Sequence, residues 1–264
     1  MSPMIGSNIS SRGRGVSFLS QRFGPVAENL QLLLDYEDWN AGEPLPNVYP
    51  DNSGITELQD NNSVQEETSS PLVGSKSGRY DDSNNKHHSA PNNSSLQIGG
   101  ETDIYIACWL RFDTLPSTKG NQKAQLSHLD FSNDKGYLLY INASDEVRFG
   151  IGGRFSGKNP VSIPDTNEHF LEAFYLSSTL EIFARLDNNS RQLQTIRSSQ
   201  PGAANVDLTV GAYNEGVDRF MDGALDQIMV EVAPQGELFW PDHSSWLYNS
   251  GNGRSSYEIL NYNP

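Results

Sequence analysis

Paired acidic residues are the first candidates for catalysis. Glu101 and Asp103 are separated by one residue, so an extended strand would place both carboxyl groups on the same face of a sheet. Retaining hydrolysis of a glycosidic bond uses two carboxyl groups about 5–5.5 Å apart, one as nucleophile and one as general acid. Here the pair lies at the start of a predicted strand, and the third acid of an E-x-D-x-x-E pattern is missing. We therefore predict a protein that is not an enzyme and has no catalytic residues.

Histidine and cysteine, the usual ligands of transition metals, are sparse. His87 and His88 are adjacent, but no cysteine or second histidine pair stands at ligand spacing. We interpret the two histidines as part of a solvated loop. The single cysteine, Cys108, cannot form an internal disulfide, and its apolar neighbours predict a small buried side chain.

The charge balance restricts the class of partner. The 264 residues include 18 Lys and Arg against 33 Asp and Glu, a net charge of −15 at pH 7. Nucleic acids and anionic lipids attract basic surfaces, so we expect neither nucleic acid nor membrane as a partner. The sequence also contains no apolar run long enough for a transmembrane helix and no apolar segment typical of a signal peptide. We expect a soluble protein that is made in a cytoplasm.

Strand patterns run through most of the chain after residue 30. In Asp103–Leu115 both alternating faces are largely apolar, which predicts a central strand buried on both sides. Asp207–Glu231 reads as two short strands joined by a Gly/Asn turn, whereas residues 37–95 are rich in Pro, Asn, Ser and Asp and read as loops. Further strands are expected at Leu30–Tyr36, Gln125–Phe131, Gly136–Ile141, Glu146–Ile151, Glu168–Tyr175 and Leu180–Arg185.

Several of these segments resemble motifs of one fold family. Asp103–Leu115, Gly136–Gly152, Leu208–Tyr213 (LTVGAY) and Phe220–Val230 are similar, in this order along the chain, to strands of laminin-G-like and concanavalin A-like lectin/glucanase domains. The tail, Phe239–Leu260, resembles the ending of such domains in bacteriophage virion proteins, with a short helix around Trp246–Tyr248. The resemblance implies an all-β fold, a two-sheet antiparallel β-sandwich of the jelly-roll type.

The resemblance also implies two kinds of binding residue. Jelly rolls of this kind often hold a structural Ca²⁺ through an acidic residue of the closing strand. Asp226 occupies that position here, and Asp222 or Asp82 could assist; the alternative is that Asp226 makes a turn or edge hydrogen bond. Sugar binding would use aromatic and amide side chains at the loop end of the sandwich. The candidates are Tyr213, Asn214, Tyr137 and Trp109, each of which could instead belong to the core or to a turn.

The N-terminal segment differs in composition from the rest. Residues 1–27 are rich in Ser, Gly and Arg, and all of their charge is positive, so they cannot form a core. We predict an extended N-terminal anchoring arm (1–27) followed by a laminin-G-like jelly-roll domain (28–264). The arm could fold back on its own acidic domain, but we favour docking onto a partner protein, through Arg12, Arg14, Val16, Phe18, Leu19, Arg22 and Phe23.

Three classes of function fit these features. We favour a non-enzymatic structural or accessory protein of a bacteriophage virion, for capsid decoration or as a tail or fibre component. It would display the jelly roll, bind other virion proteins through its arm, and form a homo-oligomer in the assembly. The alternative is a carbohydrate-binding module that mediates adhesion to host surface glycans. The third is a glycan hydrolase with a diverged site.

Overall fold

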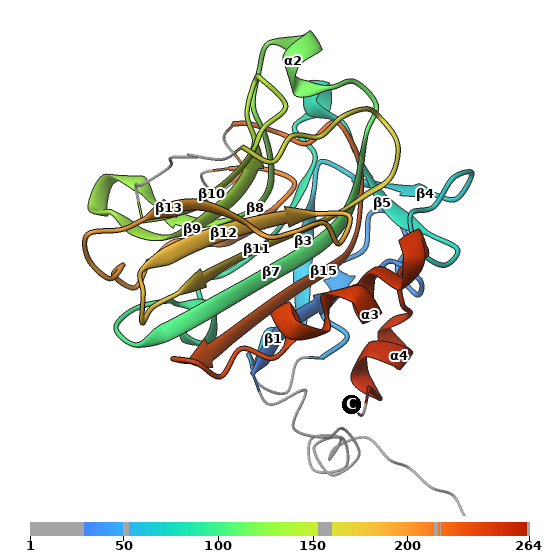
Figure 1. The fold of residues 1–264 in the computed structure, drawn as a ribbon. Coiled ribbons are helices and arrows are strands. Elements are labelled where there is room, and N and C mark those ends of the chain that lie inside the picture. Colours follow the sequence, from blue (N-terminus) through green and yellow to red (C-terminus); the bar gives the residue numbers. More distant parts are fainter. Residues whose placement is uncertain (1–28, 50–52, 153–159, 214–215, 217, 263–264) are drawn as a thin grey trace, which may run out of the picture.

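The computed structural model shows two antiparallel sheets that face each other (Figure 1). It describes residues 29–49, 53–152, 160–213, 216 and 218–262. The two-sheet antiparallel β-sandwich expected from the sequence is confirmed. The anchoring arm predicted for residues 1–27, with its docking residues, lies outside the described part of the chain.

The first sheet has eight strands and contains the longest ones. Its order is β13-β12-β11-β7-β15-β5-β4, and β1 pairs with β15 beside this path. The strands are β1 (Leu30–Leu34), β4 (Gln65–Glu67), β5 (Ser77–Tyr80), β7 (Thr102–Phe112), β11 (His169–Leu176), β12 (Glu181–Leu186), β13 (Gln192–Ile196) and β15 (Gly223–Pro234).

The second sheet has seven strands in the order β10-β9-β8-β14-β6-β3-β2. They are β2 (Leu45–Pro46), β3 (Glu57–Asn61), β6 (His87–Ala90), β8 (Lys123–Asp130), β9 (Lys135–Ile141), β10 (Val147–Ile151) and β14 (Leu208–Val210). The short α-helices are α2 (Pro116–Lys119), α3 (Ser244–Tyr248) and α4 (Ser256–Leu260), and 3-10 turns occupy 82–84, 94–96, 131–133, 240–243 and 249–251. None of the helices in the described residues is long and apolar enough to cross a membrane.

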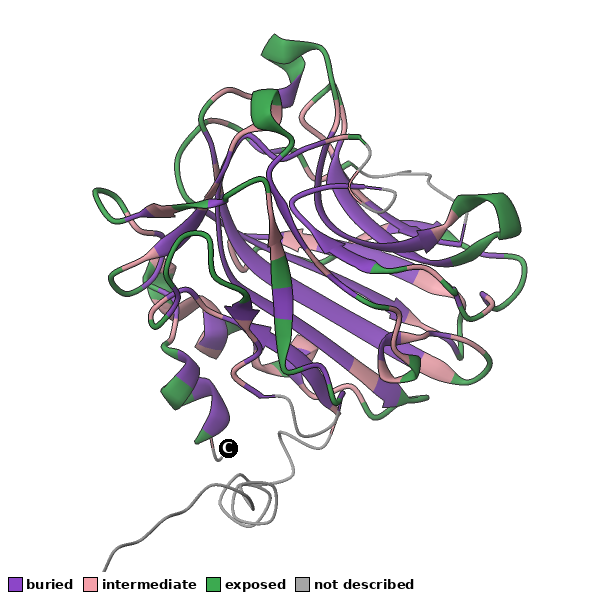
Figure 2. Ribbon diagram, turned by 180° about the vertical axis from the view of Figure 1, so that it is seen from behind, coloured by how far each residue is buried: buried purple, intermediate pink, exposed green. Residues whose placement is uncertain are grey.

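Strand β7 explains why the first sheet is buried on both faces (Figure 2). Ile106 and Cys108 point into the core between the two sheets, as the alternation predicts. Tyr105 and Trp109 point to the opposite face, where they pack against the C-terminal segment that carries α3 and α4. Figure 1 shows these helices beside β15 and β1. The C-terminal segment therefore covers a second apolar surface that would otherwise face water.

Two expectations about strands are wrong. The segment 207–231 does not form a hairpin, because β14 belongs to the seven-stranded sheet and β15 to the eight-stranded sheet. The chain crosses between the sheets after Gly211, whose φ of +79° and contact with the Tyr80 ring exclude a larger residue. Residues 37–95 are not loop throughout, since β2 to β6 lie there. Several of these strands are short and polar, so periodicity does not reveal them.

Three polar groups singled out in the sequence have structural roles. His87 and His88 are buried on β6 rather than solvated in a loop. Asp103 is also buried: one carboxylate oxygen accepts hydrogen bonds from the backbone N and the Oγ of Ser177, both at 2.7 Å, and the other accepts one from Gly236 N at 2.8 Å. The acidic residue at the start of β7 therefore fixes two neighbouring loops.

Candidate functional site

The loops above the ends of β5 and β15 form a polar site at the top of the sandwich in Figure 1. The register of the sheet creates it, because Gly223 of β15 pairs with Tyr80 of β5. Asp222 precedes Gly223 and Asp82 follows Tyr80 closely, so antiparallel pairing places the two acids side by side. They come from parts of the sequence 140 residues apart.

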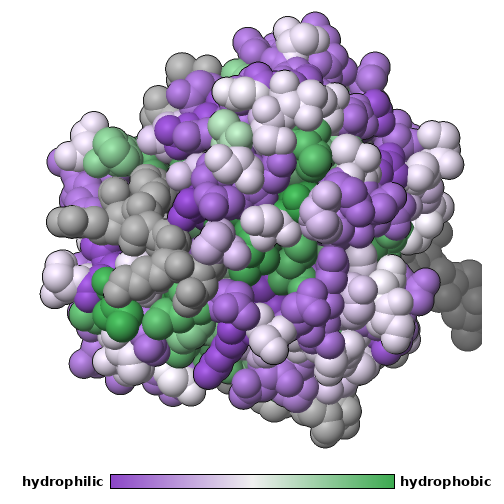
Figure 3. Space-filling model, turned by 45° about the horizontal axis from the view of Figure 1, so that its top comes forward, coloured by the Kyte–Doolittle hydropathy of each residue, from purple (hydrophilic) through white to green (hydrophobic). Residues whose placement is uncertain are grey.

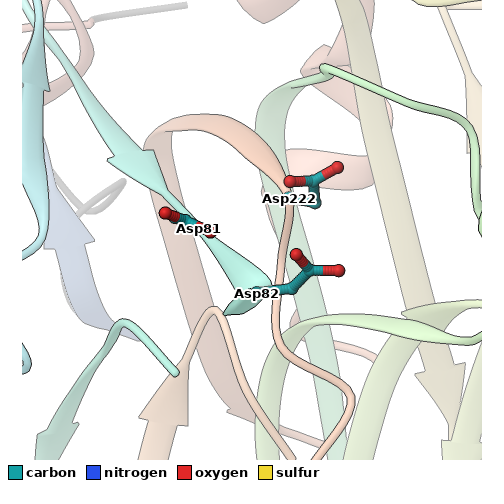
Figure 4. Close-up of side chains that lie close together, drawn as sticks. All are labelled: Asp81, Asp82 and Asp222. Atoms are coloured by element: carbon teal, nitrogen blue, oxygen red, sulfur yellow. The ribbon is translucent and has the colours of Figure 1, made fainter. Parts of the chain in front are cut away.

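Three carboxylates gather here: Asp81, Asp82 and Asp222 (Figure 4). In each residue one carboxylate oxygen lies within 4.8 Å of those of the other two. Lys119, at the end of α2, places its Nζ 2.7 Å from Asp222 Oδ2 and 3.0 Å from Asp82 Oδ1. Partial burial opposes ionisation of Asp82, but the lysine contacts outweigh it and lower its pKa. The same ion pairs raise the pKa of Lys119 above its usual value despite burial.

The carboxylate oxygens of this cluster are suitable ligands for calcium, but nearby lysines already neutralise part of their charge. Ca²⁺ takes carboxylate and carbonyl oxygens as ligands, and the cluster offers three carboxylates. However, the ammonium groups of Lys119 and of the buried Lys123 contact two of them. A divalent ion would have to displace Lys119 from between Asp82 and Asp222. The site therefore forms a salt-bridged cluster in this structure.

A cavity of about 550 Å³ adjoins the cluster. Its lining combines hydrogen-bond donors, acceptors and one aromatic side chain. Arg219 stands over the ring of Tyr213, with its guanidinium carbon 4.3 Å from the ring centroid, and over Tyr140 at 5.4 Å. Figure 3 shows this end of the molecule, where apolar atoms reach the surface in a hollow surrounded by hydrophilic residues. The lining residues are Asp82, Gly120, Asn121, Gln122, Lys123, Asp218, Arg219 and Phe220.

The predicted sugar-binding residues are distributed over different places. Tyr213 lies beneath Arg219, next to the cavity, and Asn214 is outside the described residues. Tyr137 is fully buried between the sheets, where its ring packs on His128, so it has no surface to offer a ligand. Trp109 is buried on the other face of the eight-stranded sheet.

The predicted calcium ligands are also separated. Asp222 and Asp82 meet at the loop end, whereas Asp226 pairs with Trp109 further along β15 and is not part of that cluster. Its carboxylate accepts hydrogen bonds from Val73 N, Ser77 Oγ and Gln227 N, at 3.2, 2.9 and 2.8 Å. Burial raises the pKa of Asp226 well above its usual value, although these hydrogen bonds oppose the shift.

Sequence reasoning missed most of the loop-end residues. Asn121 and Gln122 follow α2, and Arg219 lies in the crossover between the sheets. None of them belongs to a periodic segment or to a spaced motif. Only the strand pairing, which closes contacts across long sequence distances, identifies them as neighbours of Asp82.

Comparison with known proteins gives the fold class. No protein-family model matches this chain, and no curated protein matches it in sequence. Three solved structures with similar folds come from a mosquitocidal protein, a botulinum neurotoxin and an arabinanase. The binding domain of Paraclostridial Mosquitocidal Protein 1 has a TM-score of 0.56 and 11% identity over 89% of this chain.

The second structure is of botulinum neurotoxin type C, whose cell entry depends on interaction with two ganglioside molecules (TM-score 0.58, 11% identity, 86% of this chain). The third is domain 4 of AbnA, a GH43 extracellular arabinanase from Geobacillus stearothermophilus, in complex with arabinotriose (0.55, 8%, 78%). This chain spans about half of the mosquitocidal and neurotoxin chains (52% of each) and nearly all of the arabinanase domain (94%). At such identities the likeness shows a shared fold: a jelly-roll β-sandwich of the kind found in binding domains.

Proposed function

We propose that the protein is a carbohydrate-binding module that does not catalyse a reaction. The observation that carries this proposal is the loop-end cavity, in which carboxylate, amide and guanidinium groups line one hollow beside Phe220. Sugars present hydroxyl groups that donate and accept hydrogen bonds, together with apolar C–H faces. A site for them needs a few well-placed polar groups and an apolar or aromatic surface.

The rigidity of the site also favours binding. Arg219 is stacked on two aromatic rings, and such cation–π contacts contribute about 0.5–1 kcal/mol at exposed sites. Asp82 is held by two lysines, so its position is set before a ligand arrives. Preorganised groups lose little freedom on binding, which improves affinity.

The similar structures support a binding role over a catalytic one. This chain covers almost the whole of the arabinanase domain, whose structure is a complex with arabinotriose. Cell entry of botulinum neurotoxin type C depends on ganglioside molecules, but this chain spans only about half of that chain. The structural clamp formed by Asp103 is also consistent with a non-catalytic protein.

A place for this module on a bacteriophage particle stays a prediction. It depends on the basic segment 1–27 and on the resemblance of the C-terminal tail to virion proteins. The two ideas are compatible, because a displayed lectin-like module can bind host glycans. Binding of the full chain and of a Δ1–27 truncation to particles that lack the protein would test the anchoring role of the arm.

Substitution of Arg219 by alanine is expected to weaken glycan binding about tenfold, because the guanidinium is both a donor in the cavity and the cover of Tyr213. Glycan arrays that include arabinan oligosaccharides would identify a ligand, and isothermal titration calorimetry would compare the variants. Arg191→Ala is the matched control, since Arg191 also stacks on an aromatic ring, Phe183, but outside the site. Equal affinity for both variants would place the sugar elsewhere.

Calcium can reach Asp81, Asp82 and Asp222 only when Lys119 leaves the cluster, so we expect the wild-type protein to bind calcium weakly. Because the Lys119 ammonium stands between two of the carboxylates, Lys119→Met is expected to increase calcium affinity at least about tenfold. Calorimetric titration with CaCl₂ would measure this, and adding Asp222→Asn should reverse it. If Lys119→Met binds calcium as weakly as the wild type, the three aspartates do not form a calcium site.

A further inference from the structure

A second polar cavity lies where the chain crosses from β3 in one sheet to β4 in the other. Its volume of about 590 Å³ falls in the range of small-molecule sites, about 300–1,000 Å³. The turn 82–84 contributes to both cavities, since Asp82 lines the loop-end cavity and Asn84 lines this one. The lining residues are Ala41, Gly42, Asn62, Ser63, Val64, Gln65, Asn84 and Lys86.

The cation of this lining, Lys86, is buried without a partner. Lys86 is only 7% exposed, and its Nζ makes no hydrogen bond or ion pair with any of the described residues. Lysine is almost never buried unless its charge is paired, because an unpaired buried charge costs free energy. Lys119 and Lys123, by contrast, each contact a carboxylate of Asp82. The ammonium group of Lys86 therefore lacks an anion that the cavity has room to admit.

The carboxylates nearest to this lining are bound to other donors. Asp81 accepts hydrogen bonds within its own turn, from Ser83 and Asn84. Asp60 accepts from two backbone N–H groups, those of residues 42 and 64. Glu66 accepts from the backbone N–H of residue 41 and pairs with Lys76 at 3.4 Å. None of these three acids forms an ion pair with the lysine of the cavity.

Uncharged polar groups surround the mouth of the cavity. Ser63 and Gln65 are exposed, and their side chains make no hydrogen bond among the described residues. The amide of Asn62 donates to Asn85 O at 3.0 Å, which fixes its orientation and leaves its own oxygen as an acceptor. The cavity thus combines one unpaired cation with hydroxyl and amide groups, which suits a ligand that carries both an anionic group and hydroxyl groups.

We propose that this cavity binds an acidic sugar through its carboxylate. The carboxylate would pair with the Lys86 ammonium group, where charge-assisted hydrogen bonds are stronger than neutral ones. The sugar hydroxyl groups would bond with Ser63 and with the amides of Asn62 and Gln65. A singly charged carboxylate suits the site better than a phosphate, because the net charge of −15 repels each further negative charge. The proposal rests on the proposed carbohydrate-binding function and adds a sugar class and a second site.

The test uses the full chain and three kinds of probe: trisaccharides of galacturonic, glucuronic and mannuronic acid, the methyl esters of these trisaccharides, and inorganic phosphate. We expect at least one uronate to bind at least about tenfold more tightly in calorimetry than its ester, which keeps the hydroxyl groups but loses the charge. If no uronate binds more tightly than its ester, the carboxylate assignment is wrong. If phosphate binds as tightly as the best uronate, the sugar assignment is wrong.

Lys86→Met tests the role of the ammonium group. The variant keeps an unbranched apolar side chain and should fold, because it removes a buried charge that has no partner. Uronate binding is expected to weaken about tenfold, whereas the weak binding of the methyl ester should be unchanged. Wild-type uronate affinity in Lys86→Met would contradict the proposal.

A second variant locates the site without changing the buried lysine. Ser63 is exposed, lines the cavity and has a φ of +58°, a conformation that Asp adopts more readily than most residues. Ser63→Asp places a competing carboxylate at the mouth and is expected to abolish uronate binding. Ser250→Asp makes the same change at an exposed position with a φ of +57°, away from the cavity, and should have no effect. Equal uronate affinity in the two variants would place the acidic sugar elsewhere.

The Arg219→Ala variant separates the two sites, because Arg219 lines only the loop-end cavity. Uronate binding should be unchanged in this variant. If neutral glycans bind through Arg219 while no uronate is preferred over its ester, the second site fails and the proposed function stands. If uronate binding responds to Ser63→Asp while Arg219→Ala affects no glycan, the loop-end site fails and the second site stands.

Discussion

Substitution of Glu172 by alanine is expected to lower the free energy of unfolding by about 3–5 kcal/mol, the range for breaking a buried ion pair. Glu172, on β11, is fully buried. Its carboxylate accepts two hydrogen bonds from Arg185, at 2.7 and 2.8 Å, one from Tyr105 at 2.7 Å and one from Ser244 at 2.6 Å. Its removal leaves the partly buried guanidinium of Arg185 with only the Pro241 carbonyl as acceptor, and it takes away the acceptor of the Tyr105 hydroxyl.

Urea denaturation followed by fluorescence measures this effect. Glu57→Ala, at an exposed position of β3, is the control and should change stability by less than about 0.5 kcal/mol. The double variant Glu172→Leu with Arg185→Leu should be more stable than Glu172→Ala, because no charge is left unpaired. A small loss of stability in Glu172→Ala would mean that Arg185, Tyr105 and Ser244 do not hold the Glu172 carboxylate as the structure shows.

The second large effect concerns acid stability. His88 is fully buried, with its Nδ1 2.9 Å from the Tyr80 hydroxyl and its ring against Trp39. Burial, and then the neighbouring His87, lower the pKa of His88 to about 3. The unfolded chain binds this proton near pH 6.5, so stability is fully present above about pH 6.5 and is lost as pH falls toward 3. At about pH 4 the loss from this residue is about 3 kcal/mol.

His88→Gln separates this contribution from the general acid response. The variant loses packing at neutral pH, but it has no imidazole to protonate. Its stability deficit relative to the wild type should therefore shrink by about 3 kcal/mol between about pH 7.5 and pH 4. Denaturation curves at a series of pH values give the difference directly. A deficit that is independent of pH would contradict the assignment.

How far the sequence predicts this fold depends on how strongly each strand is buried. Strands β7, β9, β10, β11 and β12 were expected within a few residues of their observed bounds, because their apolar residues follow the period of a sheet face. The short helix α3 was expected as well. In contrast, β4 and β5 have the sequences QEE and SGRY, and only their backbone pairing defines them as strands.

The site was harder to predict than the fold because it depends on pairing. Asp222 and Asp82 were both named as candidates, but no spacing in the sequence brings them together with Lys119. The alternation in β9 predicts that Tyr137 lies on one face without saying which face is the core. Asp226 lies on the closing strand, as the sequence predicts. The register of β15 is irregular between Asp226 and Met229, and periodicity does not predict the hydrogen bonds that Asp226 makes with Val73 and Ser77.

The most direct test of the account is to map where a bound glycan protects the protein. Hydrogen–deuterium exchange, with and without a glycan identified on the array, should show slower exchange at residues 119–123 and 218–222, which line the loop-end cavity or the adjoining acidic cluster. Binding that leaves exchange at these residues unchanged, or no binding by any glycan, would contradict the proposal that this β-sandwich is a carbohydrate-binding module.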